Sequence, residues 1–223
     1  MSKTDSPNYL CDLHIHTAAS DGGYSAEEVV AQAADRGMQA IAITDHDSVA
    51  SNARAVAEGE RLGVRVIAGI ELTTNERRHL LGYFLRPGDC ELYRYLAGLR
   101  DLSWAHMQRM LARLRPRGVN VSERELAERT AEGIPNMSHL LDLLHRRGDL
   151  TEGRFDSREA IELFGDPDYL VNFFREFAAT RPFTDTVGAI RLIREAGGVP
   201  VWAHPLQNGE IDEAEVARLA ALG

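Results

Sequence analysis

Two histidines near the N-terminus, His14 and His16, are the first residues whose types and spacing indicate chemistry. They belong to the apolar stretch 10–15, which predicts a short buried strand, and residues two apart on a strand project from the same face. Two adjacent imidazoles gain little in a core, because each ring nitrogen needs a partner. A shared metal ion satisfies both, and a carboxylate, Asp21, follows in a glycine-rich turn. Alone, the pair is a weak signal for a metal site.

The composition bounds the class of protein. The chain has 223 residues, of which 44% are hydrophobic and 26% charged, as in a soluble globular protein. We expect neither a membrane span nor a signal peptide, and Cys11 and Cys90 are too few for a disulfide framework, which favours a cytoplasmic protein. The net charge of −9 argues against extended nucleic acid as a partner. It does not exclude a small phosphorylated substrate, because bound cations reverse the local field.

Short apolar runs alternate with amphipathic segments over residues 10–88 and predict parallel βα units. Ser25 and Glu28 have the spacing of a capping box, at the start of a helix that should end at Gly37. The other elements expected in this part are a strand at 40–44, a helix capped by Ser48 and ending at 62–63, a strand at 64–70, and a strand at 79–85.

From residue 89 to residue 183 the pattern becomes almost entirely helical, with apolar residues every three or four positions. It predicts helices over 92–114, from Ser122 onward, over 136–147 and over 166–179. The α/β pattern then resumes with a helix at 185–196 capped by Thr184, a strand at 199–203 and a helix at 212–222. We therefore expect an α/β domain of residues 1–88 and 184–223, with a helical insertion, 89–183, that covers its active site.

Metal-competent side chains gather at the ends of the predicted strands. Asp21, His46, Glu71 and His204 follow the carboxyl ends of strands, His14 and His16 lie late in theirs, and His79 opens one. In parallel α/β barrels this end carries the active site. Taken singly, each residue has a structural alternative: His46 could cap a helix, His79 could lie on an edge strand, and Glu71 could lie in a solvated turn. Their joint arrangement favours a single site.

These motifs resemble those of the PHP (polymerase and histidinol phosphatase) domain. In chain order they are His14-Ile15-His16-Thr17, Ser20-Asp21-Gly22, Thr44-Asp45-His46-Asp47, Gly69-Ile70-Glu71, the sequence His-Leu-Leu-Gly-Tyr at 79–83, and Ala203-His204-Pro205. A helical insertion before the last motif resembles the PHP phosphoesterases that act on small nucleotides, including 3′,5′-bisphosphates. The resemblance implies a distorted (β/α)7 barrel with two or three metal ions at the carboxyl ends of its strands.

The resemblance also implies a set of metal ligands. It assigns residues to three ions, the first two of which share Glu71: His14, His16 and Glu71; Glu71, His79 and His204; and Asp21 with His46. The ions would be Mn, Zn or Fe, and a set of nitrogen and oxygen ligands does not choose among them.

With such ions the reaction would be hydrolysis of a phosphate ester by a metal-activated hydroxide, because a divalent ion lowers the pKa of water toward neutrality. Asp21 would be a catalytic residue as well as a ligand. His139, in the insertion, is the candidate to protonate the leaving oxygen, its alternative being a helix-surface histidine. His106 and His145 are expected to be structural.

Two features depart from the resemblance. Where nucleotide phosphatases of this kind carry basic residues, the chain has Met137 and residues 206–208, and Arg100, Arg109 and Arg181 are the candidate replacements. The chain also has five predicted strands instead of seven and lacks a closing Ser-Asp-x-His motif. We therefore expect the last strands of the barrel to be absent, which leaves an open edge through which the protein could associate with another chain.

The favoured function is metal-dependent hydrolysis of a phosphate ester of a small metabolite, with a nucleotide mono- or bisphosphate as the expected substrate. A second hypothesis is hydrolysis of a C–N bond, since amidohydrolase barrels also use His-x-His and metal ions. The Asp21 and His46 pair, and the absence of a strand pattern for a carbamylated lysine, weigh against it. A third hypothesis is a PHP-like binding module without turnover.

Overall fold

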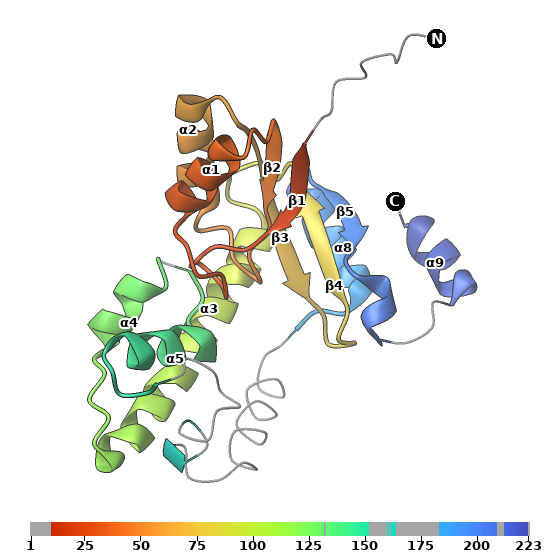
Figure 1. Ribbon diagram of the computed structural model, residues 1–223. Coiled ribbons are helices and arrows are strands. Elements are labelled where there is room, and N and C mark those ends of the chain that lie inside the picture. Colours follow the sequence, from red (N-terminus) through yellow and green to blue (C-terminus); the bar gives the residue numbers. More distant parts are fainter. Residues whose placement is uncertain are drawn as a thin grey trace.

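The computed structural model describes residues 10–131, 133–151, 160, 162–163, 183–208 and 212–222. Among these residues, five strands form one sheet in the order β1-β2-β3-β4-β5, with helices packed against it (Figure 1). The strands are β1 (Cys11–Ile15), β2 (Ala40–Ile43), β3 (Arg65–Thr73), β4 (His79–Tyr83) and β5 (Val199–Trp202). β1, β2 and β3 run parallel, whereas β4 is antiparallel to both of its neighbours. The predicted α/β class is confirmed.

The sheet is curled, and the side chain of Tyr83 marks the curl. Its hydroxyl donates to the backbone carbonyl of Leu13, 2.9 Å away, although two strands separate β4 from β1. In a flat sheet these strands would lie about 14 Å apart, at roughly 4.8 Å per strand. The bond therefore requires a concave face, as expected for part of a barrel.

Two helices complete the βα units that the sequence predicts. α1 (Ala26–Asp35) begins at the capping box formed by Ser25 and Glu28, as predicted. α2 (Asn52–Leu62) does not begin at the predicted cap, Ser48: its N-cap is Ser51, whose hydroxyl donates to the buried carboxylate of Asp45 instead of capping the helix. The two helices bury apolar side chains against β2: Val30, Ile41, Ile43 and Ala55 are among them.

β1 departs from the expectation of a buried strand. Leu10 and Leu13 are 52% and 40% exposed, and only Ile15 packs against the apolar cluster beneath α1. β1 is the edge of the sheet, so it has a single neighbouring strand within the described part of the chain. The apolar composition of the stretch predicted the strand, but its burial depends on neighbours that composition does not reveal.

The β3–β4 hairpin brings His79 to the same edge of the sheet as the ends of the parallel strands. Thr73 pairs with His79 across the hairpin. The connection, residues 74–78, is too short for a crossover, which needs a dozen or more residues, so β4 must be antiparallel. The first residue of β4 therefore lies where the other strands end.

The insertion contributes three described helices: α3 (Glu91–Leu114), α4 (Glu123–Arg129) and α5 (Met137–Arg146), with the 3₁₀ turn η1 (Arg115–Arg117) after α3. The first half of α3 packs its Leu92 and Leu96 on the sheet side, with Ile70 and Ile193. Its second half forms a separate core with α4 and α5: Met110, Leu111, Leu126, Leu140 and Leu144 are central to it. The domain boundaries at 89 and 183 stay predictions, and the helix expected at 166–179 lies outside the described residues.

The last part of the described chain returns to the sheet. α8 (Thr186–Glu195) leads into β5, and η2 (Pro205–Asn208) and α9 (Glu213–Ala220) follow. Asp185, not Thr184, caps α8, by accepting from the amide of Gly188. Arg78 ties α9 to the hairpin, through a 2.8 Å ion pair with Glu215 and a guanidinium 5.3 Å from the ring centre of Trp202. Within the described segments, none of the helices is both long and apolar enough to cross a membrane.

Candidate metal centre

Glu71 lies at the centre of the site, with its side chain 1% exposed. Because side chains alternate along a strand, Ile70 and Leu72 pack against the helices while Glu71 points to the concave face. Its backbone is held on both sides, since the Glu71 amide donates to the carbonyl of Asp45 and the amide of Asp47 donates to the carbonyl of Glu71. The strand therefore presents a buried carboxylate in a rigid position.

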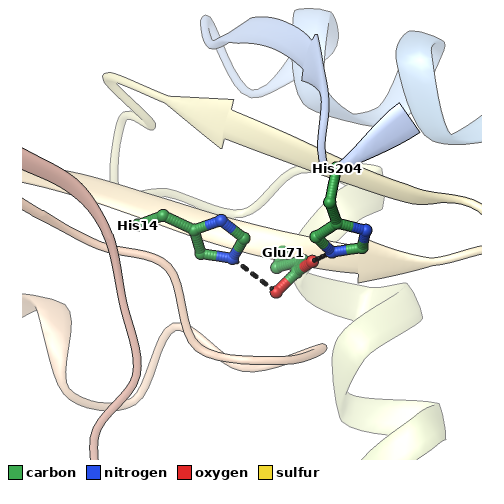
Figure 2. Close-up of side chains that lie close together, drawn as sticks. All are labelled: His14, Glu71 and His204. Carbon is green, nitrogen blue, oxygen red and sulfur yellow. Dashed lines mark hydrogen bonds and ion pairs between the residues drawn. The ribbon is translucent and has the colours of Figure 1, made fainter. Parts of the chain in front are cut away.

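Four imidazoles bond directly to this carboxylate. His14 Nε2 and His16 Nε2 each lie 2.9 Å from Oε2, while His79 Nδ1 and His204 Nε2 lie 2.9 and 2.8 Å from Oε1. Figure 2 shows His14 and His204 approaching opposite oxygens of Glu71. Histidines from β1, β4 and the end of β5 thus meet at one side chain.

The histidines also contact one another in a closed circuit, which we call the histidine ring. It consists of five imidazoles, and successive ring centres lie 4.6–5.8 Å apart, in the order His14, His16, His46, His79, His204 and back to His14. His204 adopts a φ of 29°, in the left-handed region that non-glycine residues rarely enter. The ring surrounds Glu71 on the concave face of the sheet.

Asp21 extends the cluster beyond Glu71. Its carboxylate lies 2.6 Å from His16 Nδ1 and 3.9 Å from His46 Nε2. His46 Nδ1 is buried without a hydrogen-bond partner, and 3.5 Å separates it from the Glu71 carboxylate. A buried ring nitrogen with no partner is costly in a protein interior, and a metal ion is one group that satisfies it.

The pKa values of the cluster are shifted by burial and by the hydrogen bonds between its imidazoles and carboxylates. Burial disfavours the imidazolium of His16, but hydrogen bonds to Asp21 and Glu71 outweigh it and raise the pKa of His16 to about 10. Burial likewise opposes ionisation of Asp21, yet its hydrogen bond to His16 and the neighbouring histidines lower its pKa to about 2. Despite its own burial, Glu71 has a pKa far below the usual range, because of hydrogen bonds from His16 and His79. For His46 burial is the main effect, and it lowers the pKa.

The ligand atoms fall into two groups that fit divalent metal ions. One group is His14, Glu71 and His204, the other is His16, His46 and Glu71, and within each group the ligand atoms lie within 4.8 Å of one another. A mixed set of imidazoles and carboxylates suits Mn, Zn or Fe. The grouping differs from the one that the resemblance implies, because it separates His14 from His16. Glu71 is common to both groups.

The histidine ring lines a cavity of about 880 Å³, which is within the roughly 300–1,000 Å³ typical of small-molecule sites. Pro205 and Leu206, after β5, complete the described lining. The six residues of the ring and its central carboxylate all face this space, so a ligand that enters the cavity meets them directly.

His139 lies away from the cavity. It is 2% exposed, its Nε2 donates to the carbonyl of Ala18 at 2.9 Å, and its Nδ1 accepts from the amide of Asn136 at 3.2 Å. Burial lowers its pKa to about 4. Both ring nitrogens are therefore engaged by backbone, an arrangement that does not favour the predicted role in protonating a leaving group.

The residues considered for phosphate binding are also dispersed. Met137 is 5% exposed in the core of the insertion, so this position does not reach the cavity. Arg109 contacts Nδ1 of His106 at 3.2 Å, and Arg100 lines a different cavity, next to Asp47. Arg181 and the side chains of residues 207–208 lie outside the described part of the structure.

Sequence reasoning missed the role of Asp45. This carboxylate is fully buried and accepts hydrogen bonds from the Thr17 amide and hydroxyl and from the hydroxyl of Ser20. The signal was present, because a charged residue that directly follows a buried strand and precedes a candidate ligand, His46, needs nearby donors. Apart from the nearby Ser51 hydroxyl, the donors come from a segment 25 or more residues away, which the sequence does not pair with Asp45.

The chain is similar to several phosphoesterases. It is 32% identical to phosphoribosyl 1,2-cyclic phosphate 1,2-diphosphodiesterase of Eggerthella lenta, over 90% of this chain and 76% of that protein. It is 31% identical to the 5′-3′ exoribonuclease Rnm of Escherichia coli, over 88% of this chain and 65% of the relative. A shorter match, 32% identical over 48% of this chain and 39% of the relative, is to 3′,5′-nucleoside bisphosphate phosphatase of Chromobacterium violaceum.

The fold of the chain also resembles that of a solved structure. A solved structure of a proposed metal-dependent phosphoesterase from Bifidobacterium adolescentis superposes with a TM-score of 0.72 at 22% identity, over 97% of this chain and 76% of that one. The family model of the PHP domain matches residues 12–216. The chain therefore belongs to the PHP domain family. Within that family, its relatives place it among the phosphoesterases.

Proposed function

We propose that this chain hydrolyses phosphate esters of a small metabolite, with nucleotide mono- and 3′,5′-bisphosphates as the substrate class. The observation that carries the proposal is the histidine ring around the buried Glu71, which lines a cavity of about 880 Å³. Two relatives support the same substrate class, because their names state a cyclic phosphate and a nucleoside bisphosphate as substrates.

Two or three divalent ions, Mn, Zn or Fe, would be held at this site. The proposed ligands share imidazole or carboxylate groups at the edge of the concave face: His14, His16, Asp21, His46, Glu71, His79 and His204. Bound there, the ions would polarise a phosphoryl oxygen and activate water, which is the chemistry that a phosphate ester requires.

The side chains that line the cavity bear on which group accepts the phosphoryl group. None of the described residues that line the cavity is a serine, threonine or cysteine, so the lining offers none of these side chains as a nucleophile. Because the five histidines and Glu71 of the lining are proposed as metal ligands, water is the proposed acceptor of the phosphoryl group. Asp21, hydrogen-bonded to His16, is proposed both as a ligand and as a catalytic residue that keeps the His16 ring oriented.

The size and charge of the molecule favour small substrates. A net charge of −9 argues against extended nucleic acid as the substrate, because binding it requires a broad positive surface. A small phosphate ester can enter the cavity, where the bound cations would reverse the negative field. Both cysteines are free, and phosphorylated metabolites are intracellular compounds, which together favour a cytoplasmic role.

A substrate screen tests the proposal and separates it from its alternatives. Metal-stripped protein, reloaded with Mn²⁺ or Zn²⁺, is incubated with nucleoside monophosphates, 3′,5′-bisphosphates, cyclic phosphates and a matched set of amides, with Glu71→Gln as the control. The expected result is that the wild type alone releases phosphate from mono- or bisphosphates, or opens cyclic phosphates to monoesters. Turnover of amides only would indicate a C–N hydrolase, and tight metal and ligand binding without turnover of any compound would indicate a binding module.

A further inference from the structure

The four residues between His16 and Asp21 form a short, fully enclosed segment, which we call the connecting segment 17–20. Thr17, Ala18, Ala19 and Ser20 are each between 0 and 3% exposed. The segment joins two proposed ligands that lie 2.6 Å apart, His16 Nδ1 and Asp21 Oδ1. Its backbone therefore determines where Asp21 stands relative to the histidine ring.

On one side, the connecting segment is held by the α/β domain. The buried carboxylate of Asp45 accepts from the Thr17 amide at 2.7 Å, from the Thr17 hydroxyl at 2.8 Å and from the Ser20 hydroxyl at 2.6 Å. These bonds link the first and last residues of the segment to the residue before His46. They leave its three carbonyls at 18–20 to be satisfied by other groups.

On the other side, the insertion satisfies all three of these consecutive carbonyls. The Ala18 carbonyl accepts from His139 Nε2 at 2.9 Å, that of Ala19 from the Ile134 amide at 3.1 Å, and that of Ser20 from Asn136 Nδ2 at 2.7 Å. The packing is close as well: a Cβ on Gly133 would lie 1.9 Å from the Ala19 oxygen, so only glycine fits there.

Asn136 and His139 use both ends of their side chains. Asn136 Oδ1 accepts from the His139 amide and His139 Nδ1 accepts from the Asn136 amide, each at 3.2 Å, which starts α5. Their remaining donors hold the connecting segment. The same two side chains therefore begin α5 and hold the connecting segment in place. The insertion contributes no side chain to the described lining of the cavity.

We propose that the N-terminal turn of α5 positions Asp21 and His16 for metal binding through the connecting segment 17–20, with Asn136 and His139 as positioning residues. The inference rests on the proposed function, because it takes Asp21 and His16 as metal ligands. It gives the insertion a role in the metal centre itself. Groups that orient metal ligands typically contribute about 10- to 100-fold to metal affinity.

Two pairs of variants test this role. Asn136→Ser exchanges one good N-cap for another but removes the Nδ2 donor to Ser20. Ser122→Asn makes the reverse exchange at the N-cap of α4, whose described residues make no hydrogen bond to the connecting segment. His139→Leu removes both bonds of the imidazole. His139→Gln keeps an acceptor for the Asn136 amide and a donor for Ala18, as in a capping box.

The measurement is calorimetric titration of the metal-stripped full chain with Mn²⁺, alongside thermal unfolding without metal and kcat on the best phosphate ester. We expect Asn136→Ser and His139→Leu to weaken the binding of one ion by about 10-fold and to leave the other ion unchanged. Ser122→Asn and His139→Gln should bind Mn²⁺ as the wild type does, and His139→Gln should keep its kcat.

Each other outcome overturns the proposal in a distinguishable way. If Asn136→Ser and His139→Leu lower the melting temperature but bind Mn²⁺ like Ser122→Asn, the contacts are merely structural. Loss of kcat in His139→Gln at full metal occupancy would make His139 a proton donor instead. If the wild type binds Zn²⁺ or Fe²⁺ but not Mn²⁺, the same comparison is made with the ion that binds. A folded wild type that binds none of the three would refute the proposed function, and this inference with it. Should His139→Leu fail to fold, Asn136→Ser carries the test, because its helix cap is preserved.

Discussion

The eight histidines of this chain divide between two regions and behave differently in them. Five belong to the histidine ring, where they contact one another and face a cavity, and four of these bond to Glu71. The other three lie in the insertion, where His139 and His145 bond to backbone carbonyls and His106 contacts Arg109. The same side chain thus lies beside a shared carboxylate at a cavity in one region, and bonds to backbone carbonyls or contacts an arginine in the other.

The difference teaches that partners, more than residue type, decide what an imidazole can do. A ring nitrogen bonded to a carbonyl must carry its proton and cannot bind a metal ion. In the histidine ring the partner is a shared carboxylate, and protons or metal ions can supply the positive charge that it requires. In the insertion, burial keeps His139 neutral, with a pKa of about 4.

The largest effect is expected at the shared carboxylate. Glu71→Gln should lower kcat/KM by about three orders of magnitude, because it removes a ligand common to both groups of metal-binding residues. Steady-state kinetics with the best phosphate ester at limiting Mn²⁺ measures this. Glu125→Gln, in the capping box of α4, is the matched control and should keep wild-type kinetics. Near-normal turnover of Glu71→Gln would mean that the carboxylate is not shared.

The next effect is the dependence of the free energy of unfolding on pH, and it arises from His139 in the insertion. Between pH 6.5 and pH 4 the unfolded chain takes up a proton at His139 that the folded chain does not, because burial lowers the folded-state pKa to about 4. The free energy of unfolding should therefore fall with pH across this window, by on the order of 3 kcal/mol from this residue. In His139→Gln that contribution is absent. Urea unfolding of both proteins at pH 7 and pH 4.5 compares the two, and identical decreases would show that His139 is not held neutral.

A smaller effect separates a histidine of the ring from one of the insertion. His14→Ala should weaken Mn²⁺ binding by about 100-fold, because it removes a proposed metal ligand. Removing a group that only orients a ligand typically lowers metal affinity by about 10- to 100-fold, so the loss of a ligand should lie at the upper end of that range. His145→Ala, whose Nδ1 bonds to the Leu150 carbonyl, should bind Mn²⁺ normally. Titrations of the two metal-stripped variants make the comparison, and equal losses would contradict the division of the histidines into two kinds.

The smallest effect is confined to stability. Ser122→Ala removes the capping hydroxyl of α4 and should lower the free energy of unfolding by about 1 kcal/mol. Because α4 contributes no residue to the described cavity lining, kcat/KM at saturating metal should not change. Denaturation and kinetics on the same preparation report both quantities. A parallel loss of activity would show that the whole insertion, and not only the N-terminal turn of α5, is coupled to the site.

Local patterns determined much of this protein. The capping boxes of Ser25 and Ser122 start helices where the spacing of cap and partner predicts them. The α/β class followed from the alternation of short apolar runs and amphipathic helices, and His14, His16, His46, Glu71 and His204 were found because each lies near a strand end. These features are readable from sequence because helix caps, strand periodicity and strand ends involve residues close together in the chain.

Only the tertiary structure decided which side chains meet. His204 bonds to Glu71 from 133 residues away, and His139 reaches Ala18 across 121 residues. Met137 stands where related phosphatases carry a basic residue, and it lies in the core of the insertion. Such pairings depend on the curl of the sheet, the antiparallel β4 and the docking of α5, which are set by packing over the whole molecule. The sequence determines which side-chain donors and acceptors the protein has. Burial and long-range contacts determine which of them can bind a ligand.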